Sequence, residues 1–544
     1  MKNKINTFGI LLLIYSLTGC VKLDQQPHSF ISPQEFYKSE SDANASVIGI
    51  YPYVFSDNRI NFLNVMGCVG SVDDGRFLDL SSTGPIDNDE LNYDVWVGEY
   101  TGIRMANTTI DGLKSSPISN QIKNRYLAEA KVLRAYFYFD LLRLYGDIPY
   151  RDSSAVITDK IGLTPIEEIY VNTINAFKWA IPYMWQPGEK PTGRVDIIAA
   201  KTLLADIYIT LASSARSYNP ATSAKGLKPY YTDFKDSINA YYQNAKQLCG
   251  DIISNPGKYK LLPNWTDLWG KTETTDNRGN GEFIWVNQTI DGIWGFEDCE
   301  LPAFTNYAPA FDGGPFYNIT YEFVKTYNPN DTRFKEGFVW SYIDVSRTDK
   351  VQIERWRRHL DDKSYPTVMD NVIISETADT LIWEANYWGL APKKFFDETY
   401  KTNLSSGMSL AHPLYRMADI YLWYSEAENE LNGMTQDCVD KINPIRLRAN
   451  LPLYTAGQYS KDVFRNKILD ERLWEFYAEE KDYFDLVRFG QLEERCKGVE
   501  TAIDGKDTNS DPRPRTAANY WVPYPALEKK TNTDMANLDR MNYN

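Results

Sequence analysis

Flat aromatic rings in polar, glycine-flanked segments are the side chains of this sequence best suited to hold a ligand. Rings on irregular segments often form binding sites, because a rigid scaffold can present them to solvent. The segment DGIWGFED and the one after it predict a site for non-covalent binding, with five candidate rings: Trp294, Phe296, Tyr307, Phe311 and Phe316.

The polar segment SVDDGR contains Asp73, Asp74 and Arg76. Asp73 and Asp74 could bind Ca²⁺, but the spaced ligands of a calcium loop are missing, so solvated acids are the simpler interpretation. The three histidines are far apart in sequence, which argues against a histidine metal site. We therefore expect no cofactor.

Motifs for catalysis are missing from the sequence. It contains no G-x-S-x-G, no H-E-x-x-H and no G-x-x-x-x-G-K-[ST]. Glycoside hydrolysis would need two carboxylates at a set separation. Because the chain has 73 acidic residues, some pair would always fit, and the acids alone carry no information. We therefore predict a binding protein and not an enzyme.

Cys20 is a candidate for lipid attachment because of the residues that precede it. Lys2 and Lys4 form a basic start, and the apolar run FGILLLIYSL follows at residues 8–17. This run is shorter than the about 20 residues of a membrane span and suits the core of a signal peptide. The sequence LTGC, which ends at Cys20, resembles the lipobox of bacterial lipoproteins. An ordinary secretory signal that ends near a cysteine is the alternative.

Composition restricts the possible partners and folds. The formal net charge is −15, so a nucleic acid backbone would repel the chain. An apolar fraction of 43% is ordinary for a folded protein and allows a sizeable core in 544 residues. The cysteines other than Cys20 form no C-x-x-C pair, so they fit buried apolar positions better than a zinc site or a disulfide framework.

Hydrophobic periodicity predicts a mainly helical chain. Apolar residues recur at helical spacing in segments separated by short joints, as in stacked helical hairpins. Gly146 and Gly433 follow two of these segments as stop signals, and Pro165 opens another. The expected helices are 33–51, 121–145, 165–180, 195–211, 233–253, 415–431, 437–449 and 461–489, the last with a break near residue 481.

The sequence changes character between residues 254 and 411, where helical periodicity fades and glycines recur. Eight of the 14 tryptophans fall here, which marks the region as the expected ligand-binding part. The segment EFIWV predicts one short strand over residues 282–286. Trp265, Trp269 and Trp285 lie in helix-like or strand-like patterns and are expected in the core, whereas glycines flank Trp294.

Five segments, in their order along the chain, resemble the SusD/RagB family of outer-membrane nutrient-binding lipoproteins of the Bacteroidota. They are AEAKVLRAYFYFDLLRLYGDIPY (128–150), YRMADIYLWYSEAENELNG (415–433), INPIRLRANLPL (442–453), ILDERLWEFYAEEKDYFDLVRFG (468–490) and YWVPYPALE (520–528). Their apolar residues recur at helical spacing, so the pattern by itself indicates structural helices and not a binding site. Charges three residues apart can pair along a helix, as Arg472 with Glu475 and Asp485 with Arg488, which predicts an ion-paired or solvated face.

The resemblance implies a body of tetratricopeptide-like αα-hairpins that supports an irregular, aromatic- and glycine-rich ligand-binding region with short strands. It also implies that Trp96 packs on a helix, and that the segment with Asp73 and Arg76 contributes ligand contacts. The implied parts are a signal peptide (1–19), a lipidated tether (20–31), an N-terminal helical part (32–253), the ligand-binding region (254–411) and a C-terminal helical part (412–544).

The same resemblance implies a non-catalytic lipoprotein on the outer face of the outer membrane. It would bind oligosaccharide or polysaccharide and deliver it to a SusC-like TonB-dependent transporter. Aromatic rings would cover the apolar faces of the sugars, and polar side chains would bond their hydroxyl groups. Two alternatives stay open, namely a peptide ligand in place of a glycan, and a helical-repeat adaptor.

Overall fold

The computed structural model describes most of the helical part of the chain and several pieces of the region between residues 254 and 411. The described residues are 36–54, 63, 70–72, 89–154, 161–189, 193–218, 234–269, 279–287, 317–324, 326–338, 341–343, 352–355, 371–374, 382–384, 389–390, 392–394, 411–496, 500–501, 511–512, 517–532 and 534–535.

Helices dominate the described chain, so the predicted mainly helical fold is confirmed. The long helices are α2 (Glu40–Ile48), α5 (Asp89–Lys114), α6 (Asn120–Tyr145), α7 (Ile166–Ala180), α8 (Ile197–Ser217), α9 (Ile238–Ser254), α14 (Met417–Asn432), α15 (Gln436–Arg448), α16 (Lys461–Phe476) and α17 (Asp482–Phe489). Short turns include η2 (Ile181–Tyr183), η4 (Trp265–Leu268), α12 (Thr332–Glu336), α18 (Leu492–Arg495) and α19 (Ala526–Thr531).

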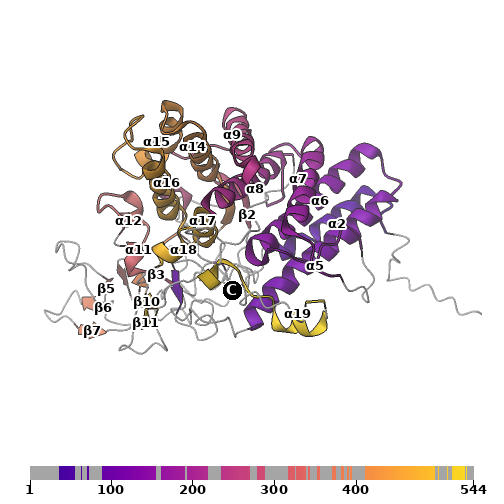
Figure 1. Cartoon of the computed structure of the whole chain (residues 1–544), viewed down its shortest axis with the longest axis horizontal. Helices are drawn as coiled ribbons and strands as arrows, with labels where there is room; N and C mark the ends of the chain where they lie inside the picture. The colour runs from indigo at the N-terminus through magenta and orange to yellow at the C-terminus, as the bar shows by residue number, and fades with distance from the viewer. Residues whose placement is uncertain are drawn as a thin grey trace, which may run out of the picture.

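The helices follow one another across the body (Figure 1). Helices α2, α5, α6 and α7 form one end, α8 and α9 lie in the middle, and α14 to α16 form the other end. Consecutive helices pack together, and α14 also packs against α9, which joins the two halves of the chain. This is the stacked-hairpin arrangement expected from the short joints between helical segments.

Local signals in the sequence fix several helix ends. The Ser119 hydroxyl accepts a hydrogen bond from the Ile122 N–H at the start of α6. Gly146 ends α6 with a φ of 71°, a conformation that glycine adopts without a steric cost. Asp196 caps α8 in the same way, through the Ala199 N–H at 3.0 Å. These ends agree with the predicted helices to within a few residues.

Helix α5 (Asp89–Lys114) was not predicted, and three predicted helix starts are wrong. Helix α9 begins at Ile238 and not at residue 233. The first helix begins at Glu40 and not after Ser32, because Ser39 and Asp42 form a reciprocal capping box. Likewise, Tyr415 lies in a strand, and α14 starts two residues later, at Met417. The predicted break near Lys481 is confirmed, since α16 ends at Phe476 and α17 starts at Asp482.

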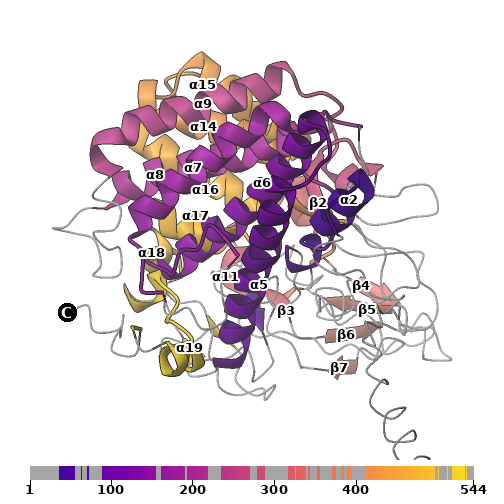
Figure 2. The same ribbon diagram turned by 90° about the vertical axis from the view of Figure 1, so that its right-hand side faces the viewer.

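Most of the short strands lie in the described pieces between residues 254 and 411, whereas β1 belongs to the N-terminal helical part and β9 to the C-terminal one. They are β1 (Gly70–Val72), β2 (Phe283–Asn287), β3 (Tyr317–Thr320), β4 (Ser341–Ile343), β5 (Gln352–Arg355), β6 (Asn371–Ile374), β7 (Ile382–Glu384), β8 (Gly389–Leu390) and β9 (His412–Arg416). Antiparallel pairing gives the sheets β1-β3-β8, β2-β9 and β4-β5-β6-β7. Only β2 was predicted; Figure 2 shows β4 to β7 beside the helices and not among them.

The core lies between the helices. Tryptophans expected in the core are all buried there: Trp96, Trp265, Trp269 and Trp285. Helix α8 is long and apolar enough to cross a membrane, but nearly nine-tenths of it is buried inside the body, as is usual for a core helix.

Candidate functional site

The predicted ligand and lipidation residues lie outside the described residues. This holds for Cys20, Asp73, Arg76, Trp294, Phe296, Tyr307, Phe311 and Phe316. Their roles stay predictions. The structure does describe two strands, β1 and β3, that flank two of these segments.

The sheet β1-β3-β8 brings two candidate segments to one place. Val72, the last residue of β1, pairs with Tyr317, the first residue of β3. Asp73 follows Val72 in sequence, and Phe316 precedes Tyr317. The chain positions that lead into these two segments therefore meet at the same end of one sheet, although they are far apart in sequence.

Lys394 ties the region between residues 254 and 411 to the C-terminal helices. Its fully buried ammonium donates to the backbone carbonyls of Glu475 and Tyr477, at 2.8 and 2.9 Å, and to the Glu479 carboxylate at 2.6 Å. The nitrogen also lies 3.9 Å from the Tyr477 ring centroid. The carbonyls belong to the end of α16, so Lys394 satisfies acceptors that the helix itself leaves open.

Arg416 is the centre of a buried ion cluster next to Lys394. Its guanidinium donates to the carboxylates of Glu282, Glu475 and Glu479 at 2.7 to 3.0 Å. Arg448 shares Glu282 and Glu475 with it, at 2.7 Å each. We call this set the buried ion cluster; its members are Glu282, Asp331, Arg333, Lys394, Arg416, Arg448, Glu471, Glu475 and Glu479.

The cluster keeps its carboxylates ionised. Burial by itself would raise the pKa of Glu479, but the Arg416 guanidinium and the Lys394 ammonium lower it to about 2. The same competition, with Arg448, Arg416 and Arg333 as the cations, holds the pKa of Glu475 far below its usual range. Since buried charges are costly unless they are paired, the cluster depends on every partner.

One of the two predicted ion pairs is confirmed. Arg488 contacts Asp485, with 2.8 Å between the charged atoms. Arg472 instead pairs with Asp485 and Asp419, while Glu475 belongs to the buried ion cluster. The alternative of a solvated face is wrong, because all these side chains are buried. Lys394 and Arg333, which complete the cluster, carry no local sequence signal.

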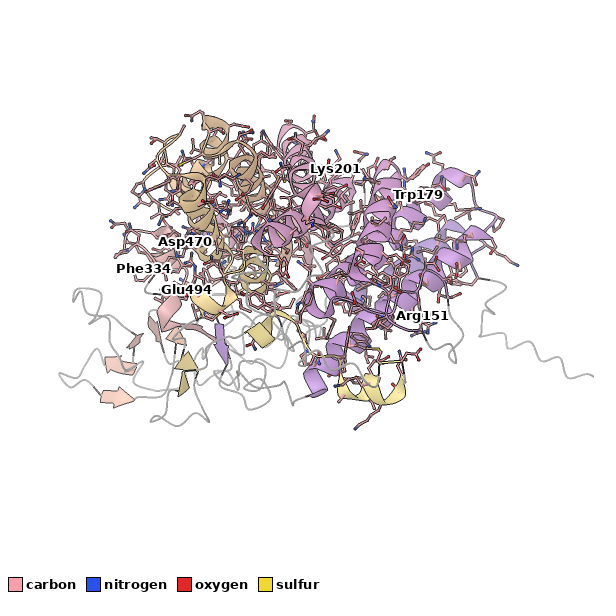
Figure 3. All side chains as sticks on the ribbon, viewed as in Figure 1. Arg151, Trp179, Lys201, Phe334, Asp470 and Glu494 are labelled. Carbon is pink, nitrogen blue, oxygen red and sulfur yellow. The ribbon has the colours of Figure 1, made fainter. Side chains whose placement is uncertain are left out.

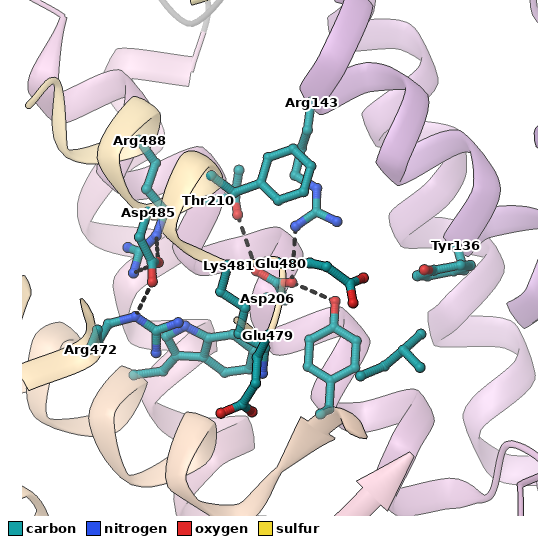
Figure 4. A pocket seen from close by; sticks show the side chains of 14 residues that line it. Tyr136, Arg143, Asp206, Thr210, Arg472, Glu479, Glu480, Lys481, Asp485 and Arg488 are labelled. Atoms are coloured by element: carbon teal, nitrogen blue, oxygen red, sulfur yellow. Dashed lines mark hydrogen bonds and ion pairs between the residues drawn. The ribbon is translucent and has the colours of Figure 1, made fainter. Parts of the chain in front are cut away.

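A small polar cavity lies between α6, α8, α17 and the turn before α17 (Figure 4). Asp206 accepts hydrogen bonds there from Tyr415 at 2.6 Å and Thr210 at 3.2 Å, and lies 3.5 Å from Arg143. With a volume of about 40 Å³, the cavity has room for a few water molecules and not for a sugar ring. Its charges balance, with four cations and four carboxylates: Arg143, Arg472, Lys481, Arg488, Asp206, Glu479, Glu480 and Asp485.

Among the described residues, no group of three or more potential ligands could hold a metal ion. The described free cysteines, Cys249, Cys438 and Cys496, are buried as expected. Burial raises the pKa of Cys438 to about 12, so this thiol is inert at neutral pH.

Comparison with known proteins agrees with this framework. The model of the SusD family matches residues 254–542, and a second family model, described as starch-binding and associating with the outer membrane, matches residues 79–209. The SusD-like protein P25 of Formosa agariphila is 24% identical over 99% of this chain and 98% of its own length. The starch-binding protein SusD of Bacteroides thetaiotaomicron is 23% identical over 68% of this chain and 65% of its own length.

Solved structures show the same fold. A SusD superfamily protein from Parabacteroides distasonis is 22% identical, with a TM-score of 0.67 over 90% of this chain and 98% of that one. A SusD homologue from Bacteroides thetaiotaomicron is 17% identical and reaches 0.69 over 92% and 97%. Because a family model covers more than half of the chain and relatives span nearly all of it, this chain belongs to the SusD family of non-catalytic, glycan-binding surface proteins associated with the outer membrane.

Proposed function

We propose that this protein is a lipoprotein, anchored through Cys20, that binds oligosaccharide or polysaccharide outside the cell. It passes the glycan to a SusC-like TonB-dependent transporter in the outer membrane. The helical parts, 32–253 and 412–544, form the scaffold, and residues 254–411 hold the ligand together with Asp73 and Arg76. Family membership supports glycan binding, and one strand pairing in the fold supports the location of the binding site.

That observation is the pairing of Val72 with Tyr317. It brings the residue before Asp73 and the residue after Phe316 to one sheet end, as a composite site requires. The neighbouring strand β8 pairs with β3 through Ile319 and Leu390, and Lys394 follows it in the chain. Ile319 in the central strand of this sheet is fully buried, which favours a fixed base for ligand-binding loops.

A glycan is favoured over a peptide because of the named relatives. Solved structures with the same fold are described as a laminarin-binding SusD-like protein and as surface glycan-binding protein A from Bacteroides thetaiotaomicron. A pure adaptor would not need the aromatic segments between residues 292 and 316. A glycan-array screen of the mature chain without its lipid (residues 21–544) tests the proposal. Retention of peptides and no glycan would replace it with the peptide alternative.

Lipid anchoring predicts a large change in fractionation. Cys20→Ala is expected to move the protein from the detergent phase to the aqueous phase, because the acceptor of the acyl chains is lost. Each buried methylene of those chains contributes about 0.8 kcal/mol to membrane binding. Phase partitioning with detergent measures the change, and Cys249→Ala, which removes a buried thiol, is the control. Unchanged fractionation of the Cys20 variant would place the anchor elsewhere.

Delivery to a transporter predicts a stable complex in native membranes. Affinity purification of the tagged, acylated protein is expected to recover a TonB-dependent barrel of the SusC type in comparable amount. Mass spectrometry of the purified fraction identifies the partner, and an untagged strain gives the background. Recovery of the protein alone, in a mild detergent that preserves other outer-membrane complexes, would contradict the transporter part of the proposal.

A further inference from the structure

Two strands of the sheet β1-β3-β8 lead onto the same place in the helical body. Strand β8 ends at Leu390, and Lys394 follows four residues later, fully buried. Strand β3 continues into the short helix α11 (Tyr321–Val324), and Tyr327, which follows α11, is also buried. Both Lys394 and Tyr327 contact residues 474–479, which end α16 and form the turn after it. We call residues 474–479 the docking turn.

Lys394 holds the docking turn through a buried charge. Its ammonium donates to the backbone carbonyls of Glu475 and Tyr477 and to the Glu479 carboxylate, at 2.6 to 2.9 Å. The nitrogen also lies 4.7 Å from the Trp269 ring centroid. Because the Lys394 side chain is fully buried, it cannot touch a ligand at the surface. Lys394 therefore acts on a ligand only through the chain that it fixes.

Tyr327 holds the same turn through hydrogen bonds and ring packing. Its hydroxyl donates to the Trp474 carbonyl at 3.0 Å, and the Trp474 ring N–H donates to the Thr326 hydroxyl at 2.9 Å. The Tyr327 ring packs edge-on against the rings of Tyr477 and Phe338, with centroids 6.5 and 5.6 Å away. The chain that follows β3 is therefore fixed to the docking turn by contacts separate from those of Lys394.

A third contact joins the chain after β8 to the chain after α12. The Lys393 N–H donates to the Gly337 carbonyl at 2.8 Å, and the Tyr477 hydroxyl donates to the same carbonyl at 2.6 Å. The approach is close, because a Cβ at Gly337 would collide with that hydroxyl. Figure 3 shows Phe334 of α12 on the same side of the body as Asp470 of α16. Three segments of the region between residues 254 and 411 therefore meet at the docking turn.

Ion pairs give this arrangement one favoured position. Arg333 of α12 pairs with Glu471 and Glu475 of α16, with 2.8 and 2.9 Å between the charged atoms. If the docked chain moved, these carboxylates and Glu479 would stay buried with fewer partners, which is costly. Charge-assisted hydrogen bonds also depend on direction, whereas apolar contacts tolerate small shifts. The buried ion cluster therefore fixes the docked chain more sharply than its apolar contacts do.

We propose that Lys394 is a positioning residue for glycan binding. It holds the sheet β1-β3-β8 on the docking turn and thereby sets the place of the two candidate segments that continue from this sheet. The path runs from Lys394 through the pair of Leu390 with Ile319 to the pair of Val72 with Tyr317. Without the bonds of Lys394, the sheet takes the binding position in a smaller share of the molecules, and the apparent affinity falls with that share. The inference rests on the function proposed above, in which those segments hold the glycan.

Lys394→Met tests the proposal, since methionine keeps a flexible, unbranched side chain without the charge. We expect about tenfold weaker binding of the glycan that the array screen retains best, which corresponds to the binding position in about a tenth of the molecules. The loss should lie in the association rate. The dissociation rate should stay unchanged, because molecules in the binding position keep all their ligand contacts. Surface plasmon resonance measures both rates.

Ile169→Ala separates positioning from a general loss of stability. It truncates a fully buried side chain of α7, at the far end of the body from α16, and lowers stability as core truncations do. Both binding rates should stay at the wild-type value.

Tyr477→Phe is a milder change at the docking turn. It removes only the hydroxyl that donates to Gly337, so we expect it to fold even if Lys394→Met does not. The peptide with the Lys393 N–H should exchange hydrogen about fivefold faster, as for the loss of one buried hydrogen bond, and association with the glycan should slow.

Four results would overturn the proposal. Lys394→Met could associate at the wild-type rate, or it could only dissociate faster. Ile169→Ala could lose as much affinity as Lys394→Met, or Tyr477→Phe could speed hydrogen exchange without slower association. A wild-type chain that binds no glycan would instead refute the proposed function.

Discussion

Arg416→Met is expected to lower the free energy of unfolding by about 3–5 kcal/mol, the usual cost of breaking a buried ion pair from one side. The variant leaves Glu479 without its two bonds from the Arg416 guanidinium, at 2.9 and 3.0 Å, and removes one partner each from Glu282 and Glu475. All of these side chains are buried, so water cannot replace the lost donor. Chemical denaturation followed by circular dichroism measures the loss.

Arg495→Met is the matched control for that experiment. Arg495 forms an ion pair with Asp470 at 2.7 Å, but its side chain is 29% exposed, so the expected loss is no more than about 1 kcal/mol. Equal losses in the two variants would contradict the special role of the buried ion cluster.

The pH dependence of stability gives a second readout. The pKa of Glu479 is about 2 in the folded protein and near 4.5 when unperturbed, so its ionised form stabilises the fold above about pH 5. This contribution is lost as the pH falls from about 5 to about 2. Over this range Glu479 takes up a proton in the unfolded chain but stays ionised in the folded protein. We expect Arg416→Met to flatten this part of the curve, because a major cause of the lowered pKa is gone.

Trp294→Ala is expected to weaken glycan binding about thirtyfold and to leave the melting temperature nearly unchanged. Anchor aromatics in binding sites typically contribute about 2 kcal/mol or more, which corresponds to that loss of affinity. Gly292 and Gly295 flank Trp294, so a ligand can approach the backbone closely there. Isothermal titration with a glycan found in the array screen, together with a thermal melt, measures both effects.

Trp285→Ala provides the opposite control. Trp285 is 1% exposed, donates its N–H to the Gly193 carbonyl at 3.1 Å and packs edge-on against Tyr136. Its truncation should cost about 3–5 kcal/mol of stability, as for a core aromatic. If Trp294→Ala behaves like this control, or retains full affinity, then Trp294 is not the anchor and the segment with Asp73 and Arg76 becomes the main candidate.

Local patterns in the sequence predicted most of the long helices, but not α5 (Asp89–Lys114). The helix over residues 121–145 was predicted from its apolar spacing and from Gly146, and α6 covers Asn120–Tyr145. The break predicted near Lys481 is confirmed, and the structure places left-handed residues there at Ala478 and Glu480. Helix starts were less certain, because Ser32 with Glu35 and Ser39 with Asp42 both have the spacing of a capping box. In the structure α2 starts after Ser39.

The region between residues 254 and 411 was harder to predict, because strand pairing joins distant segments. Nothing near Val72 in sequence shows that it pairs with Tyr317, or that Ile319 pairs with Leu390. The sequence around Lys394 is that of an ordinary surface lysine. In the fold, two backbone carbonyls and Glu479 surround its ammonium. Contacts of this kind depend on long-range packing, which a periodic pattern does not contain.

The sequence by itself determined the helical class, the lipid-attachment motif, the family resemblance and the candidate rings. These depend on spacing within one segment, where each residue faces neighbours three or four positions away. Only the tertiary structure decided which charges are buried together and which apolar side chains stay exposed. Arg472 pairs with Asp485 and not with Glu475, and Trp179 stays at the surface although Trp285 is buried, because both outcomes depend on which helix packs against which.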